Sequence, residues 1–282
     1  DSFKETHRAQ YFNPDGDGVL FLEKVIRFGA KYQESQNSAQ TSLFGETADQ
    51  VYQELIIPPA EPWDNLSQLK KERAVVGIYI SGHPLDDFKK EMEWFTNAQM
   101  MQLKDLKPWV NKNLAVAGIV NDIQHLESRN GKGWARFSVE DFTDQFEFRI
   151  FGEEYLKFRH FITINQFIRI KISVKEGWRN QETGRVGEPR IQFVAFEMLH
   201  DTLSKNSKKL TLQLDIRQLE SDRIKHLKNE LKSFRGDKPL YFDVIDPKKP
   251  VKLTVPSKKQ KVAISQKLLT VLDQNQWHYK LN

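Results

Sequence analysis

The sequence predicts a multidomain chain, with a helical N-terminal connector, a five-stranded β-barrel in the middle and a small α+β domain at the C-terminal end. Two observations predict this arrangement. Apolar residues recur at helical spacing before about residue 110, and they alternate with polar residues at a period of two between residues 112 and 200. The remaining segment mixes both patterns, and 282 residues are enough for about two domains with connecting segments.

The first 62 residues predict a helix followed by a linker. Residues 18–33 place large apolar side chains at helical spacing, which predicts a helix at the end of a first segment, residues 1–32. Residues 33–62 are rich in Gln, Ser, Thr, Glu and Pro, a composition that does not build a core. We therefore expect residues 33–62 to form a flexible linker.

One short peptide in this linker carries large apolar side chains, Gln40-Thr41-Ser42-Leu43-Phe44. Leu43 and Phe44 are large and apolar, so their exposure to water is unfavourable unless something buries them. A few apolar anchors of this kind can carry most of the affinity of a peptide for a groove. The peptide is therefore either a ligand for a groove of another protein or a segment that packs back onto the neighbouring helices.

Residues 63–111 predict a helical connector. Asp64 or Asn65 is a suitable N-cap for a helix over residues 66–80, and Ser81-Gly82-His83-Pro84 is expected to end it. A second amphipathic segment follows over residues 85–95.

The alternating pattern begins after this connector and predicts five strands within residues 112–200. Three strands are followed by a helix over residues 153–161 and then by two more strands, which is the order of an OB-type barrel. The predicted strands are residues 114–123, 134–140, 146–151, 167–175 and 190–198.

Alternation also assigns the two faces of these strands, because successive side chains point to opposite sides. The apolar set is expected to form the core, which leaves a Trp and several cations pointing outward or lying in the loops. A Trp can stack on a nucleobase while cations hold phosphates, although an ordinary solvated face would show the same pattern. The candidate nucleic-acid contacts are Arg129, Lys132, Trp134, Arg136, Arg149, Lys171, Lys175, Trp178 and Arg179.

The last segment, residues 205–282, predicts a small α+β domain. Its expected elements are strands over 210–216, 240–245, 251–255 and 277–281, with helices over 220–234 and 263–273. The charge is uneven along the chain: 12 basic against 17 acidic residues before residue 112, 13 against 12 up to residue 200, and 18 against 9 beyond it. The net charge of +5 therefore comes from the C-terminal third and does not by itself mark the barrel as a nucleic-acid binder.

Several kinds of site are not expected. The absence of Cys excludes disulfides and thiolate metal ligands, and the seven His residues show no metal-binding spacing. We find no catalytic constellation or phosphate-binding loop, so no catalytic residue, metal or cofactor is predicted. No apolar run approaches the roughly 20 residues that cross a bilayer. We therefore expect no membrane partner, and we expect a cytoplasmic location.

Four motifs resemble a known family. The most specific is Gly77-Ile78-Tyr79-Ile80-Ser81-Gly82-His83-Pro84-Leu85, and the others are Ala117-Gly118-Ile119-Val120, Val139-Glu140-Asp141 and His7-Arg8-Ala9-Gln10, in which His7 replaces Asn. Together they resemble the C-terminal region of the alpha subunit of bacterial DNA polymerase III, the replicative C-family polymerase. The start at Asp1, without Met, is consistent with a fragment of such a protein.

The resemblance implies a role for each segment. Residues 1–32 would end a helix-hairpin-helix region, and Gln40, Ser42, Leu43 and Phe44 match the peptide that binds the sliding clamp, the beta subunit. The barrel would meet single-stranded template DNA, and residues 205–282 would contact the tau subunit of the clamp loader. The parent protein would be a DNA-directed DNA polymerase, with its catalytic carboxylates outside this chain.

Two other functions fit the residues. One is a stand-alone OB-fold protein that binds single-stranded nucleic acid, which would not need a clamp peptide. The other is a protein-protein scaffold, which would not need an outward Trp among cations.

Overall fold

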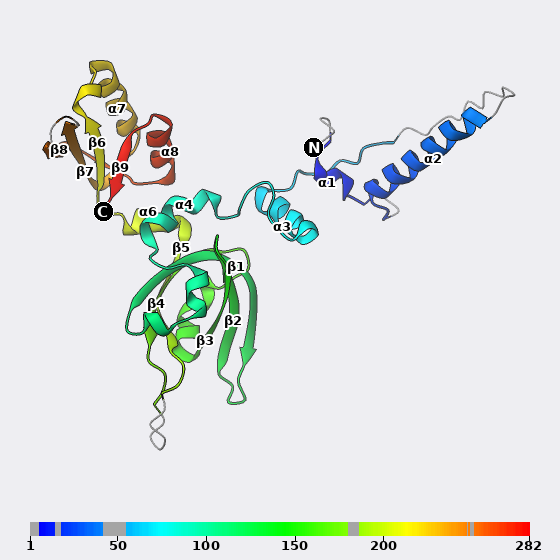
Figure 1. Ribbon diagram of the computed structural model, residues 1–282, viewed down its shortest axis with the longest axis horizontal. Helices are drawn as coiled ribbons and strands as arrows, with labels where there is room; N and C mark the ends of the chain where they lie inside the picture. Colours follow the sequence, from blue (N-terminus) through cyan, green and yellow to red (C-terminus); the bar gives the residue numbers. More distant parts are fainter. Residues whose placement is uncertain (1–5, 15–17, 42–54, 180–185, 247, 249–250) are drawn as a thin grey trace. The chain divides into compact units, whose positions relative to one another are not determined.

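The computed structural model describes residues 6–14, 18–41, 55–179, 186–246, 248 and 251–282 (Figure 1). The chain divides into two compact units, Asp1–Pro84 and Leu85–Asn282. The boundary falls inside the predicted connector, residues 63–111, so the helices of that segment belong to different units.

The first unit contains α1 (Arg8–Tyr11), α2 (Phe21–Thr41) and α3 (Asn65–Val76). Helix α2 continues to Thr41, so the prediction of a linker from residue 33 is wrong for residues 33–41. Five of these nine residues are Gln, Glu or Ala, and their high helix propensity favours the extension of the helix without an apolar stripe. Helix α3 has the predicted N-cap, since the Asp64 carboxylate accepts a hydrogen bond from Ser67 N at 3.3 Å.

The segment after α3 folds back on that helix. Gly77 ends the helix with φ of 87°, a left-handed conformation that glycine adopts at little cost. The Glu72 carboxylate then accepts hydrogen bonds from Ser81 N at 3.0 Å and Ser81 Oγ at 2.6 Å, and it also pairs with Arg8 at 2.6 Å. These bonds from Ser81 and Arg8 lower the pKa of Glu72 to about 2. The Gly77–Pro84 motif is therefore a turn anchored on α3.

The second unit begins with η1 (Asp86–Phe88), α4 (Lys89–Phe95), η2 (Met100–Lys104) and η3 (Lys107–Trp109) and continues into a five-stranded antiparallel sheet. Its strands are β1 (Asn113–Glu127), β2 (Gly133–Glu140), β3 (Gln145–Phe151), β4 (Phe167–Lys175) and β5 (Arg190–Met198). Helix α5 (Gly152–Phe158) and η4 (Arg159–Phe161) separate β3 from β4, as predicted. The sheet order is β3-β2-β1-β4-β5.

This sheet is not a closed barrel, because β3 and β5 remain unpaired edges in the described residues. The prediction of a barrel is corrected accordingly. On β5 the amide of Phe193 donates to the Glu154 carboxylate of α5 at 3.1 Å, so a side chain takes the place of a strand partner at that edge. A continuous aromatic and aliphatic core fills the inside of the curved sheet, including Phe137, Phe148 and Ile170.

Two of the family-like motifs have a structural role here. A Cβ at Gly118 would lie 2.2 Å from the carbonyl oxygen of Glu140, so only glycine allows β1 and β2 to approach this closely. Asp141 is buried, and its carboxylate accepts bonds from Met100 N at 2.8 Å and Thr143 N at 2.7 Å. It therefore fixes the β2–β3 turn against η2.

Helix α6 (Leu199–Asn206) leads from β5 into a second sheet, in the order β8-β7-β6-β9. Its strands are β6 (Leu210–Asp215), β7 (Arg235–Asp246), β8 (Val251–Val262) and β9 (His278–Leu281), with η5 (Ile216–Gln218), α7 (Ser221–Ser233) and α8 (Gln266–Gln274) between them. Strands β6 and β7 are parallel, which α7 makes possible as a crossover. The predicted α+β segment is present.

The core of this second sheet contains residues from outside it. Leu212, Leu231 and Leu268 pack together with Phe95 of α4 and Leu203 of α6.

Among the described residues, no helix is both long and apolar enough to span a membrane.

Candidate nucleic-acid interface

An aromatic row crosses the outer face of β2 and β3, next to Leu126 of β1. Register places Trp134 opposite Leu126 on one side and Phe151 on the other. The rings of Trp134 and Phe151 are stacked, with centroids 5.1 Å apart and an interplanar angle of 18°. Trp134 is half-buried and Phe151 is 55% exposed, so Phe151 presents much of the aromatic surface of this row.

A basic row lies beside it. Arg136 is opposite Gln124 and Arg149 in the register, and its Nη2 donates to Gln124 Oε1 at 2.9 Å. Both guanidinium groups contact Glu147, with Arg136 Nε 3.5 Å from Oε2 and Arg149 Nη2 3.1 Å from Oε1. The Glu147 carboxylate orients the two cations and offsets part of their charge.

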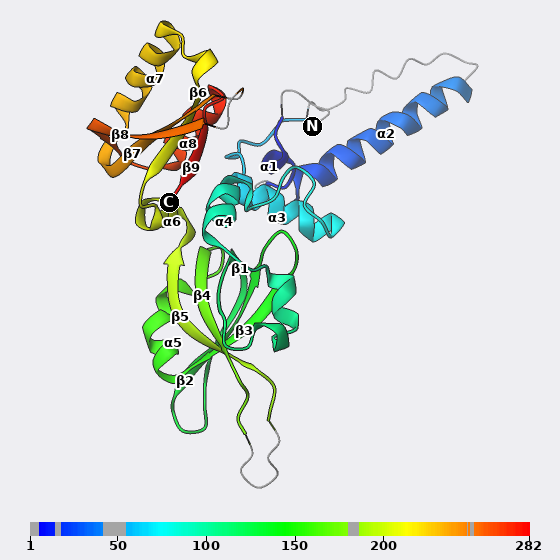
Figure 2. The same cartoon turned by 60° about the vertical axis from the view of Figure 1, so that its left-hand side comes forward.

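Two loops leave the same end of the sheet in both views of Figures 1 and 2. The β1–β2 turn carries Arg129 and Lys132, and the β4–β5 loop carries Trp178 and Arg179; all four are exposed. Lys175 ends β4 opposite Arg190, the first residue of β5. The structure therefore places seven predicted residues, Arg129, Lys132, Trp134, Arg136, Arg149, Trp178 and Arg179, on the outer face of β2 and β3 or in these two loops.

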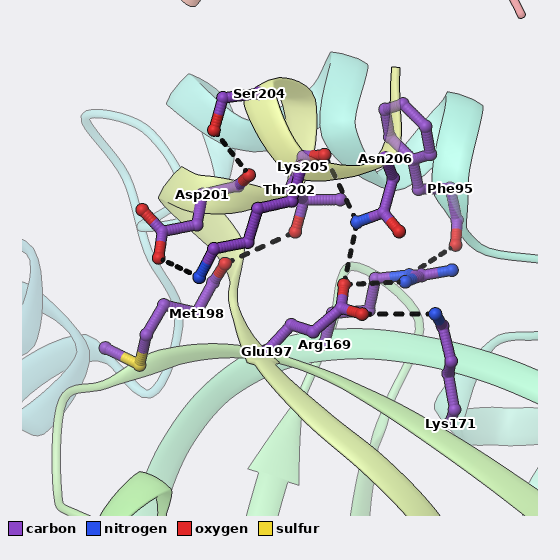
Figure 3. Close-up of polar contacts among 10 residues, drawn as sticks. All are labelled: Phe95, Arg169, Lys171, Glu197, Met198, Asp201, Thr202, Ser204, Lys205 and Asn206. Carbon is purple, nitrogen blue, oxygen red and sulfur yellow. Dashed lines mark hydrogen bonds and ion pairs between the residues drawn. The ribbon is translucent and has the colours of Figure 1, made fainter. Parts of the chain in front are cut away.

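Lys171 lies elsewhere, in a cluster between the sheet and the helices α4 and α6 (Figure 3). Its Nζ is 3.1 Å from Glu197 Oε1, while Glu197 Oε2 accepts from Arg169 Nη1 at 2.9 Å and Asn206 Nδ2 at 2.8 Å. Arg169 Nε also donates to the carbonyl oxygen of Phe95 at 2.6 Å. The predicted placement of Lys171 on one binding face with Trp134 is corrected, because α6 packs against β4 and β5 on this side and Glu197 binds the ammonium group.

The charges of this cluster hold Glu197 ionised. Burial raises the pKa of its carboxyl, but hydrogen bonds from Asn206 and Lys171 and the charges of Arg169 and Lys171 outweigh this effect, so that the pKa lies below its ordinary value. The cluster is a structural ion-pair network.

A groove, hereafter the seam groove, opens between the unpaired edges of β3 and β5. Its volume is about 570 Å³, and aromatic and charged side chains line it. The lining residues used below are Phe151, Trp178, Arg149, Arg190, Glu147 and Glu154. Four of these residues, Glu147, Phe151, Glu154 and Arg190, were not predicted as site residues. The strand register and the Trp178–Arg190 contact across the β4–β5 loop bring them together. Alternation along β3 gives only the outward positions of Glu147 and Phe151.

The predicted clamp peptide is only partly described. Gln40 lies in the last turn of α2, whereas Ser42, Leu43 and Phe44 lie outside the described residues. In the part of the chain that the structure describes, no group of three or more acidic or His side chains could hold a metal ion.

Comparisons with known proteins agree with the sequence motifs. Residues 210–282 match the family model described as DNA polymerase III alpha subunit, C-terminal domain. The chain is similar to DNA polymerase III subunit alpha of Pseudomonas fluorescens, with 22% identity over 87% of this chain and 20% of that protein, and of Thermus aquaticus, with 26% identity over 80% and 17%. The alpha subunit of Treponema pallidum is 31% identical over 43% of this chain and 10% of that protein.

Two solved structures show weaker similarity. A nucleic acid-binding lipoprotein from Klebsiella pneumoniae matches 39% of this chain and 98% of its own, with 18% identity and a TM-score of 0.25. A small single-stranded DNA-binding protein from Streptomyces coelicolor matches 31% and 94%, with 12% identity and a TM-score of 0.17. These TM-scores are too low to support an argument about fold or function.

By fold, the chain is a mixed α/β protein built on two separate sheets. By sequence, the resemblance to the C-terminal region of the DNA polymerase III alpha subunit is confirmed. The chain spans at most a fifth of the length of these three relatives.

Proposed function

We propose that this chain is a non-catalytic segment of a replicative polymerase, and that it guides single-stranded template DNA along the five-stranded sheet. We further propose that this sheet is an OB fold with one open seam. The observation that carries the proposal is the pair of rows on β2 and β3, the aromatic Trp134–Phe151 row beside the basic Arg136–Arg149 row. Such a face can stack unpaired bases on the rings and contact phosphates through the guanidinium groups.

A binding titration tests this proposal. A labelled single-stranded oligonucleotide is titrated with the whole chain at low salt, where phosphate contacts contribute most. Replacing Trp134 and Arg136 together by Ala should weaken binding by about tenfold or more, since stacking alone contributes about 1 to 3 kcal/mol per base. Lys171→Ala is the matched control, because that cation is bound to Glu197 away from this face. Equal affinity of the double variant and the unaltered chain would refute the proposal.

The tethering role has separate support. Gln40, Ser42, Leu43 and Phe44 match the pattern of a clamp-binding peptide, and a tether raises the effective concentration of a polymerase at its template without adding a catalytic contact. Replacing Gln40, Leu43 and Phe44 by Ala should abolish capture of the chain by purified clamp in a pull-down. Retained capture would remove the clamp from the proposal and leave the DNA part standing.

The C-terminal segment completes the proposed role. The family match of residues 210–282 supports a contact between residues 205–282 and the tau subunit of the clamp loader, in the bacterial cytoplasm. Co-purification of tau with the whole chain would test this contact, and failure of tau to co-purify would remove it from the proposal.

A further inference from the structure

The seam groove has exposed aromatic walls. Trp178 is 77% exposed and Phe151 is 55% exposed, and both residues line the groove. Large exposed apolar rings around one cavity mark binding sites more often than ordinary surface. The volume of about 570 Å³ lies within the range of small-molecule sites.

The Arg190 guanidinium lies 4.2 Å from the centre of the Trp178 ring. This contact supports one face of the indole and orients the ring, while the remaining surface stays open to the groove. The ring of Phe151 is stacked on Trp134, so it is also held in place. Both walls are thus oriented before a ligand arrives.

The charges in the groove are balanced. Arg149 is paired with Glu147 at 3.1 Å. Burial raises the pKa of the Glu154 carboxyl, and this effect is larger than the lowering by the hydrogen bond from Phe193 N and by the charge of Arg190. Two cations matched by two carboxyl groups do not favour an anion, whereas a flat neutral ring with polar edges can stack on the walls and bond to either kind of group.

Two cations at the rim have no ion pair within the described residues. Lys175 ends β4 opposite Arg190, and the exposed Arg179 is one residue beyond Trp178. Phosphates could contact this rim while a ring enters the groove. The division between a neutral interior and a basic rim matches the division of a nucleotide into base and phosphate.

We propose that the seam groove binds one unstacked nucleobase of a single-stranded nucleic acid, held between Trp178 and Phe151, with the adjoining phosphates at Lys175 and Arg179. The proposal rests on the proposed function, since it requires that the sheet bind single strands. It adds a site for a base at the edge of the sheet, and this site shares Phe151 with the aromatic row on the outer face.

The test compares two ligands, an oligothymidylate of about 12 nucleotides, within the range bound by one such sheet, and a strand of equal length in which the internal bases are absent. Both carry the same phosphates. The unaltered chain should prefer the strand with bases. Trp178→Ala should weaken binding of that strand by about tenfold and leave binding of the abasic strand unchanged, while Trp178→Phe should keep most of the preference.

Arg179→Ala is the matched control, one residue away. It should weaken both strands equally and reduce the salt dependence of binding, because it removes a phosphate contact. If Trp178→Ala weakens both strands equally or neither, the groove does not hold a base, and an aromatic side chain of a protein partner becomes the better occupant. If the unaltered chain binds neither strand at low salt, the proposed function itself is wrong and this inference is wrong with it.

Discussion

Two sets of cations on the five-stranded sheet follow the same alternating pattern and have different surroundings. Arg169 and Lys171 on β4 point outward, as do Arg136 on β2 and Arg149 on β3. Yet the Arg169 side chain is only 9% exposed and is bound to Glu197 and to the carbonyl oxygen of Phe95, whereas the Arg149 side chain is 63% exposed and contacts only one carboxylate in the described contacts.

The difference lies in what covers each strand. Helix α6 packs against β4 and β5, and α4 packs against α6 and β1. Figure 3 shows the polar groups that join these helices to the sheet. Alternation along a strand determines to which side of the sheet a residue points, but helices from distant parts of the chain decide whether that side meets solvent. Arg169 and Lys171 are therefore structural, and the cations on β2 and β3 can serve a ligand.

The largest effect is expected for Arg169→Met. This substitution leaves Glu197 without its most buried partner and the Phe95 carbonyl without its donor, and breaking such a pair costs about 3 kcal/mol of the free energy of unfolding. Urea denaturation followed by circular dichroism should show a clear fall in midpoint. Arg149→Met is the control and should change the free energy by less than about 1 kcal/mol; similar losses in both variants would contradict the comparison.

The second-largest effect is expected in the affinity for single-stranded DNA. Replacing Arg136 and Arg149 together by Ala should weaken binding of single-stranded DNA by about tenfold at low salt and reduce the slope of log affinity against log salt by about 1.4, or about 0.7 for each lost phosphate contact. Fluorescence anisotropy across a salt series measures both quantities. Unchanged slopes would mean that these guanidinium groups serve only Glu147.

A smaller effect depends on pH. Because the pKa of Glu197 is lower in the folded chain than in the unfolded chain, its carboxylate adds stability above the ordinary carboxyl pKa of 4.5, and this contribution is lost as the pH falls through the lower folded value. Glu197→Gln should therefore be less stable than the unaltered chain at neutral pH, and the difference in urea midpoint should narrow below about pH 4. A difference that is constant with pH would rule out a role for the ionised carboxylate.

The smallest effect is expected for Lys171→Ala. Its side chain is 37% exposed, and a partly solvated ion pair contributes about 0.5 kcal/mol. Thermal unfolding should shift only slightly, and binding of single-stranded DNA should not change. A loss of DNA affinity in this variant would place Lys171 back among the ligand contacts.

The sequence predicted the positions of all five strands along the chain and of the helix between the third and the fourth. Period-two alternation is a strong local signal in residues such as Ile168, Ile170 and Ile172. The sequence did not predict the open seam, where the amide of Phe193 donates to Glu154, 39 residues away in the chain. The prediction of a linker from composition was also wrong for residues 33–41, where α2 continues to Thr41. Glu197 and Phe95 could not be identified as partners of Lys171 and Arg169, since only the folded chain brings them together.

Phe95 has a consequence for how the chain can be divided. Its ring is part of the core of the four-stranded sheet, while its carbonyl oxygen is bound by Arg169 of the five-stranded sheet. A fragment limited to residues 210–282, the extent of the family match, would lack this ring and the side chain of Leu203 and would leave apolar surface uncovered. The smallest independently stable piece is therefore expected to begin before α4, and the two sheets should unfold in a single cooperative transition.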